Sequence, residues 1–91
     1  MSHDHISVGQ RVLDIEARAV DALKNSLDAS FSAACDLMLN AKGRVIVTGM
    51  GKSGHVGSKL AATLASTGTP SFFVHPGEAS HGDLGMITPD D

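Results

Sequence analysis

The sequence predicts an α/β fold in which two leading helices precede one parallel strand–helix–strand unit. Two short apolar runs that do not alternate with polar residues, 45–48 and 71–75, are typical of strands buried on both faces. The stretch between them, 49–70, is long enough for the helical crossover that parallel strands need. Its helix is expected to end at Gly68 and to pack by a side that consists of Val56, Leu60, Ala61 and Leu64.

Residues 1–42 are predicted to form the two leading helices. In the first helix, apolar residues recur at spacings of three and four, the period of a helix with one buried stripe. The stripe consists of Val8, Val12, Ile15, Ala19, Ala22 and Leu23. The second helix is expected to be capped by Ser26 or Asp28 and to end near Gly43. Nothing on either helix indicates chemistry, so both are interpreted as packing elements.

Composition and net charge narrow the range of functions. The 91 residues are 42% hydrophobic and 19% charged, which indicates one small globular domain rather than a disordered chain. Seven Lys and Arg against ten Asp and Glu give a net charge of −3, so the basic patch of a nucleic-acid-binding protein is not expected. No apolar run is long enough to cross a membrane, and we expect neither nucleic acid nor a membrane as a partner.

The distribution of charge favours a small anionic ligand. Residues 37–77 contain no Asp or Glu, although they carry Lys42, Arg44, Lys52 and Lys59. The only cysteine, Cys35, excludes an internal disulfide and fits a reducing compartment. Because the first residues also lack the features of a signal peptide, we expect a cytoplasmic location.

A glycine-rich turn at 49–54 follows the first predicted strand and opens the next helix. Such a turn binds anions, because the backbone is accessible and the helix start offers free N–H groups. Lys52 adds a positive charge and Ser53 a hydroxyl donor, both suited to a phosphate. The alternative is a tight turn that needs glycine for its geometry alone.

The spacing of this turn argues against the common nucleotide motifs. Gly49, Gly51 and Gly54 match the dinucleotide fingerprint, but the acidic residue expected about 20 positions later is missing. The Walker A motif would need a glycine where Ile46 stands. The turn therefore favours a small phosphorylated metabolite.

Polar residues follow the second predicted strand. His75, Glu78, His81 and Asp83 lie after its carboxyl end, at the edge where the glycine-rich turn follows the first strand. These side chains could ligate a divalent metal, or a histidine could move a proton. They also fit a polar helical turn whose histidines cap the helix and form hydrogen bonds. The spacing leaves these interpretations open.

Three motifs together closely resemble the arabinose-5-phosphate isomerases, which are built on the sugar isomerase (SIS) domain: 47–55, 66–76 and 78–83. The resemblance is loose over 1–42 and tight over 43–91. It implies that residues 1–91 are the N-terminal part of an SIS domain, with a helical segment and then a βαβ sugar-phosphate-binding part. A complete SIS domain has three αβα layers and a flavodoxin-like sheet.

The resemblance also implies an activity. Members interconvert D-arabinose 5-phosphate and D-ribulose 5-phosphate for the octulosonate sugar (KDO) of lipopolysaccharide, as cytoplasmic homotetramers that require no cofactor. Lys52 matches a catalytic lysine, which can stabilise negative charge on an enediolate or the phosphate. His75 matches a residue that binds both the substrate and a regulatory zinc. The substrate-binding residues are expected to be Gly51, Ser53, Gly54, Gly68, Thr69, His75 and His81.

The second phosphate loop of the family, its catalytic glutamates, a later histidine and both CBS modules have no counterpart in the sequence. We therefore expect a truncated chain that is inactive alone. Two alternatives stay open: a non-catalytic SIS module that senses a sugar phosphate for a regulator, and a nucleotide-binding βαβ fragment. Downstream glutamates and CBS modules would indicate the isomerase, a helix-turn-helix the regulator, and stabilisation by NAD or ATP the nucleotide-binding fragment.

Overall fold

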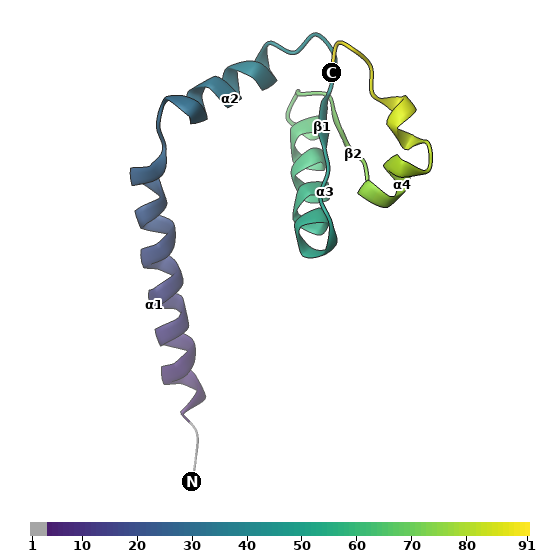
Figure 1. Cartoon of the computed structure of the whole chain (residues 1–91). Helices are drawn as coiled ribbons and strands as arrows, with labels where there is room; N and C mark the ends of the chain where they lie inside the picture. The colour runs from purple at the N-terminus through teal and green to yellow at the C-terminus, as the bar shows by residue number, and fades with distance from the viewer. Residues whose placement is uncertain (1–3) are drawn as a thin grey trace. The chain divides into compact units, whose positions relative to one another are not determined.

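A computed structural model describes residues 4–91 and divides the chain into a helical part up to residue 33 and a sheet-containing part, 34–91. The predicted order of two helices and then a strand–helix–strand unit is confirmed (Figure 1). The main elements are α1 (His5–Leu23), α2 (Ala29–Leu39), β1 (Val45–Val47), α3 (Gly51–Ser66), β2 (Ser71–Phe73) and α4 (Pro76–Ser80). Two 3₁₀ turns, η1 (Lys24–Ser26) and η2 (Asp83–Met86), follow α1 and α4.

Both leading helices begin at an aspartate. The Asp4 carboxylate accepts a hydrogen bond from the Ser7 N–H at 3.0 Å, and Asp28 accepts one from the Ser30 N–H, also at 3.0 Å. Of the two caps predicted for α2, Asp28 is therefore the one used. Hydrogen bonds from the hydroxyl and then the N–H of Ser30 lower the pKa of Asp28. The helix ends at Leu39, before the expected stop at Gly43.

The apolar stripe of α1 is exposed. No residue of this helix is buried, and Val12 in the middle of the stripe is 46% exposed. Within residues 4–33 the predicted buried face is therefore not observed. A helix buries such a stripe only against a second apolar surface, which residues 4–33 do not supply.

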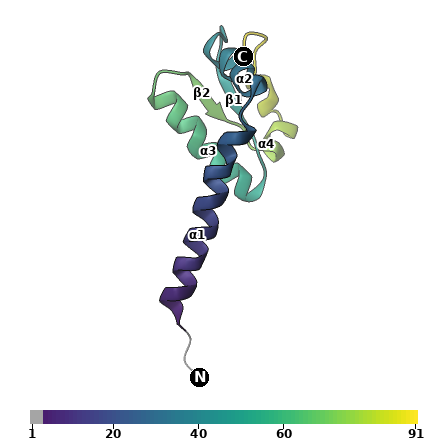
Figure 2. The same cartoon turned by 90° about the vertical axis from the view of Figure 1, so that its left-hand side faces the viewer.

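The two strands pair in parallel, as predicted. Val45 lies opposite Ser71 and Val47 opposite Phe73, and α3 connects the strands and packs against both (Figures 1 and 2). Beyond the strands, the Val74 N–H donates to the Val47 carbonyl at 2.9 Å. The parallel pairing therefore continues toward the carboxyl edge of the sheet, where the glycine-rich turn begins.

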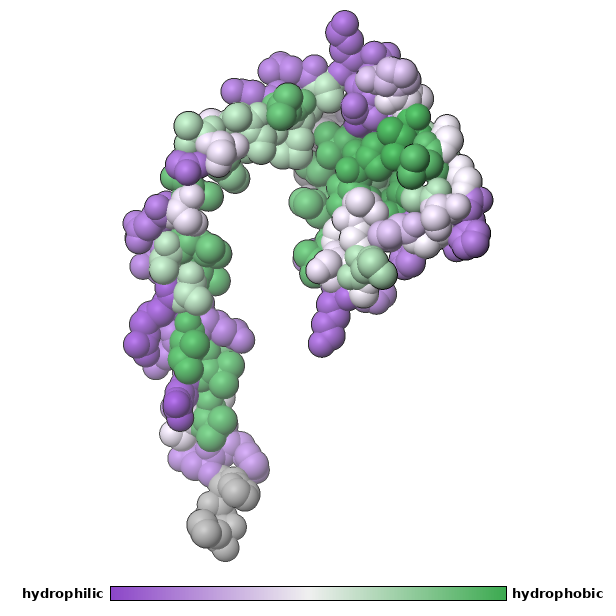
Figure 3. Space-filling view, viewed as in Figure 1, coloured by the Kyte–Doolittle hydropathy of each residue, from purple (hydrophilic) through white to green (hydrophobic). Residues whose placement is uncertain are grey.

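The strands are less buried than the sequence predicts. All their residues are half-buried, and among residues 4–91 the buried apolar core consists of Ala61 and Val74. The reason is that α3 covers only one face. Val47 and Phe73 face that helix, so their neighbours Ile46 and Phe72 lie on the other face. Figure 3 shows apolar surface over this part of the chain.

Helix α3 packs by its small residues rather than by its large apolar ones. Gly54 and Ala61 are buried, whereas Val56 is 70% and Leu60 51% exposed. The prediction that Val56 and Leu60 share the packing side of the helix is therefore wrong. A Cβ atom added to Gly57 would lie 3.1 Å from Val47 Cγ1, so a side chain there would require the valine to shift by a few tenths of an ångström.

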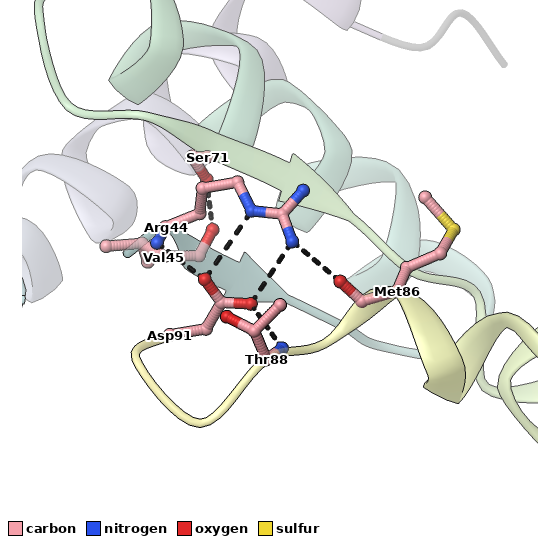
Figure 4. A network of polar contacts seen from close by, with 6 residues as sticks. All are labelled: Arg44, Val45, Ser71, Met86, Thr88 and Asp91. Carbon is pink, nitrogen blue, oxygen red and sulfur yellow. Dashed lines mark hydrogen bonds and ion pairs between the residues drawn. The ribbon is translucent and has the colours of Figure 1, made fainter. Parts of the chain in front are cut away.

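The segment after β2 is held at the start of β1 by the carboxylate of Asp91 (Figure 4). One of its oxygens accepts the backbone N–H of Arg44 at 2.7 Å, and the other accepts the Thr88 N–H at 2.8 Å. The Asp91 side chain is only 2% exposed. Gly43 packs under the same turn, and its N–H donates to the Asp90 carbonyl at 2.9 Å.

The guanidinium of Arg44 completes this network. Its Nη2 lies 3.3 Å from the Asp91 carboxylate and donates to the Met86 carbonyl at 2.6 Å. The guanidinium carbon lies 4.5 Å from the centre of the Phe72 ring, a cation–π contact. Arg44 thus connects the turn at Asp91 with η2 and with the face of the sheet that α3 leaves uncovered. We call Arg44 and Asp91 together the clasp.

We expect the clasp to make stability depend on pH in the acid range. Hydrogen bonds from the Thr88 N–H and then the Arg44 N–H lower the pKa of Asp91 from 3.8 to about 2. Because the pKa is lower in the folded chain, the stabilisation is complete above the unfolded value and is lost as the pH falls toward the folded one. Asp91→Asn should unfold at lower urea than the parent near neutral pH and lose less stability on acidification.

The control is Asp90→Asn, which removes a neighbouring carboxylate that makes no side-chain hydrogen bond within residues 4–91. It should follow the pH dependence of the parent chain. An identical pH profile for Asp91→Asn and the parent chain would contradict a role for the clasp.

We expect Gly54→Ala to destabilise the fold. A Cβ atom there would lie 2.5 Å from the Gly49 carbonyl oxygen, which belongs to the backbone and has little room to move. Overpacking of this kind costs about 1–3 kcal/mol, to be measured by urea unfolding. Gly85→Ala is the control, because its Cβ would meet nothing within 4 Å. Equal stability of the two variants would show that the close contact is not required.

Candidate functional site

A cavity of about 220 Å³ lies at the carboxyl edge of the sheet. It lies within the part of the chain that holds the sheet, between the first two turns of α3 and the end of β2. The edge agrees with the general rule that open α/β sheets bind ligands beyond the carboxyl ends of their strands. The cavity is lined by Gly51, Gly54, His55, Ser58, Phe73 and His75.

Geometry explains the glycines of the turn. Gly51 has a φ angle of +57°, in the left-handed region that favours glycine, although a Cβ there would meet nothing within 4 Å. Gly49 and Gly54 allow two backbone segments to approach closely, since a Cβ on Gly49 would lie 3.2 Å from the Gly54 nitrogen. The shape of the turn therefore accounts for these glycines. The same shape leaves the start of α3 accessible, so the anion interpretation also stands.

The start of α3 offers unpaired donors. Its first backbone hydrogen bond runs from the Gly54 N–H to the Met50 carbonyl at 3.2 Å. Within residues 4–91, the N–H groups of Gly51, Lys52 and Ser53 have no acceptor. The first turn also holds no acidic residue. Three free N–H groups at the positive end of a 16-residue helix form a site that favours an anion.

Lys52 and Ser53 lie on this first turn, and neither lines the cavity. Both side chains are exposed, and within the described part of the chain neither has a hydrogen-bond or ion-pair partner. They are therefore available to a ligand at the helix start. Their catalytic and substrate-binding roles stay predictions.

Gly68 and Thr69 lie at the other end of α3. Gly68 has a φ angle of +103°, and the Thr69 N–H donates to the Leu64 carbonyl at 2.9 Å, which closes the helix in a Schellman-type turn. The 16 residues of α3 rise on the order of 24 Å, so the fold of a single chain keeps this pair away from Gly51. The pair thus has a structural explanation, and its contact with substrate stays a prediction.

His75 lines the cavity and also caps α4. Its Nδ1 accepts a hydrogen bond from the Gly77 N–H at 3.0 Å. A neutral histidine that accepts at Nδ1 carries its proton on Nε2. His75 can therefore offer an N–H donor, which would suit an oxygen atom of a ligand.

Residues 4–91 do not supply a complete zinc site around His75, so its role in binding zinc stays a prediction. Among residues 4–91, no three His, Cys, Asp or Glu side chains gather in a way that could hold a metal ion. The Nδ1 lone pair of His75 is used by the cap, and the remaining nitrogen carries hydrogen. His81 lies outside the cavity lining, where its N–H closes α4 by donating to the Glu78 carbonyl at 3.0 Å. These contacts favour the interpretation of this segment as a capped polar turn.

Three lining residues, His55, Ser58 and Phe73, were not predicted as site residues. A signal for two of them exists in the sequence. Positions 51, 55 and 58 lie on one face of a helix that starts at 51, because residues three and four apart are neighbours on its surface. Phe73 carries no such signal, since an aromatic residue in a buried strand is ordinarily part of the core.

Comparison with known proteins places the chain in a family. The SIS domain family model matches residues 37–91, and the chain belongs to this family. The arabinose 5-phosphate isomerases KdsD of Pseudomonas aeruginosa and Escherichia coli K12 are 65% and 58% identical over 88 residues. These matches cover 97% of this chain and 27% of each relative, so the chain spans about a quarter of their length.

A solved structure agrees. The structure of Escherichia coli CFT073 c3406 in complex with arabinose 5-phosphate matches with a TM-score of 0.90 and 44% identity. The match covers all of this chain and 49% of that one. The predicted fold class, an N-terminal part of an SIS domain, is thereby confirmed.

We expect the side chain of His75 to hold the start of α4. In His75→Ala the cap is lost, which typically costs about 1 kcal/mol. The amide of Gly77, measured by hydrogen exchange, should then exchange several times faster. His75→Asn should keep it slow, because asparagine is a good capping residue. Fast exchange in both variants would show that an oxygen cap cannot replace the imidazole, and unchanged exchange in His75→Ala would contradict the cap.

Proposed function

We propose that this protein is an aldose–ketose isomerase that interconverts D-arabinose 5-phosphate and D-ribulose 5-phosphate. The observation that supports this most directly is the open start of α3. Three N–H groups without acceptors within residues 4–91 lie there beside a cavity, together with the unpaired Lys52. The arrangement suits the phosphate group of a small metabolite.

Electrostatics explains why a phosphate is favoured at this point. The helix start carries positive potential, and its free N–H groups point outward. Lys52 adds a full positive charge on the same turn, and hydrogen bonds to charged groups are about twice as strong as neutral ones. No Asp or Glu lies in this turn to repel the ligand.

The reaction moves a proton between C1 and C2 of the sugar, through an enediolate that carries negative charge. Lys52, on the turn at which the phosphate binds, is the catalytic residue we assign, because holding the phosphate positions the sugar for this step. The Nε2–H of His75, which lines the cavity, would donate to a sugar oxygen. We assign the proton-carrying base to none of the described residues.

The comparisons support the choice of substrate. The named relatives are arabinose 5-phosphate isomerases, and the solved neighbour is in complex with arabinose 5-phosphate. We also propose that the protein acts in the cytoplasm, as a homotetramer, in supplying the KDO sugar of lipopolysaccharide. These finer proposals rest on the resemblance of the motifs to that family. Within residues 4–91, no helix combines the length and the apolar character that crossing a membrane requires.

Binding by the chain is tested by NMR titration with inorganic phosphate and with arabinose 5-phosphate. The amides of Gly51, Lys52 and Ser53 should shift with both ligands. Lys52→Ala should weaken both affinities about tenfold, the loss typical of a hydrogen bond to a charged group. Lys59→Ala is the matched control, a lysine on the same helix that lies about two turns beyond its start. An equal loss in the two variants would indicate unspecific charge attraction and contradict a phosphate site.

Activity is tested in a chimera. The 88 matched residues replace their counterparts in the Pseudomonas aeruginosa relative, which supplies the rest of an intact enzyme. We expect the chimera to form ribulose 5-phosphate from arabinose 5-phosphate, and its Lys52→Ala variant to lose most of the turnover. A folded chimera that binds the sugar phosphate without turnover would overturn the isomerase and favour a binding module.

A further inference from the structure

The cavity extends along α3, away from the phosphate site. Gly51 lines it at the helix start and Ser58 lines it two turns further on. The rise between these residues is on the order of 10 Å, comparable with the length of a pentose that carries a phosphate at one end. A ligand held by its phosphate at the helix start would therefore place its sugar next to the second turn.

Two polar side chains line this second region. His55 and Ser58 lie three residues apart, so they are neighbours on the same face of α3. The ring of Phe73 and the side chain of His75 contribute to the lining from the end of β2. The region thus combines an apolar surface with a hydroxyl and two imidazoles, and none of the described lining residues carries a carboxylate or an ammonium group.

The hydroxyl of Ser58 is not used by the fold. Serine in a helix commonly donates to a carbonyl one turn back, and Ser66 of the same helix does so, to Thr63 at 3.0 Å. Within residues 4–91, neither Ser58 nor the imidazole of His55 has a hydrogen-bond partner. Both lie at the cavity and are free to pair with a ligand.

The chemistry of the cavity, whose volume is about 220 Å³, favours one class of ligand. Uncharged donors and acceptors suit the hydroxyl groups of a short sugar rather than a second acidic group. A missing hydroxyl would leave these polar side chains unpaired in the complex, which is how such sites discriminate.

We propose that His55 and Ser58 are specificity-determining residues that hydrogen-bond the sugar hydroxyls of a phosphorylated pentose. The proposal rests on the proposed function, because it takes the phosphate to lie at the start of α3. The proposal divides the binding of the ligand between two turns of α3. The first turn binds the charge that all sugar phosphates share, and the second turn binds the part in which they differ.

The test compares two affinities of the 91-residue chain, for inorganic phosphate and for arabinose 5-phosphate. Ser58→Ala and His55→Ala should each weaken the sugar phosphate about three- to tenfold, the range for one lost hydrogen bond, and leave inorganic phosphate unchanged. His55→Gln, which keeps a polar group, should recover part of the loss. Ser66→Ala is the matched control and should bind both ligands as the parent chain does.

The outcomes separate this proposal from the one on which it rests. If neither the parent chain nor the chimera binds arabinose 5-phosphate, the proposed function fails and His55 and Ser58 lose their assigned role with it. If the parent chain binds and both variants behave like Ser66→Ala, only the assignment of His55 and Ser58 is overturned. A loss of inorganic phosphate binding in the variants would also overturn it, since it would show a general effect on the helix start.

Discussion

The buried carboxylate of Asp91 is the contact on which the sheet-containing part of the chain most depends. It joins residues 47 positions apart in sequence and is almost inaccessible to water. Its oxygens pair with two backbone N–H groups and with the Arg44 guanidinium, so its charge is compensated on several sides. Two strands of three residues form a weak sheet, which makes a contact outside the strands important for order.

The clasp affects the candidate site because it fixes the segment from Val74 to Asp91, which includes His75. This segment leaves β2 at Val74, which is buried, and returns to the start of β1 at Asp91. His75 follows Val74 directly and is held further by its hydrogen bond to the Gly77 N–H. The segment that carries His75 forms one wall of the cavity and is therefore fixed at both ends. The other wall belongs to the continuous helix α3. Such attachment reduces the freedom that binding would otherwise have to remove.

Local sequence patterns correctly predicted the features that neighbouring residues determine. The parallel strands, the crossover helix and the glycine-rich turn follow from residue type and spacing, and all are present. Burial was mispredicted, because it depends on what covers each face. The apolarity of Val56 and Leu60 assigns them to the packing side, but glycine at 54 and 57 allows the closer approach. The Arg44–Asp91 pairing joins distant residues, which no local pattern indicates.

The glycine face of α3 has a consequence for the dimensions of the site. Gly54 lies in the contact with the turn and also lines the cavity. The distance at which helix and sheet meet therefore also sets how wide the cavity opens between α3 and His75. A side chain that pushed the helix outward would enlarge the binding space as it loosened the fold. A substitution at Gly54 should therefore change stability and ligand size together.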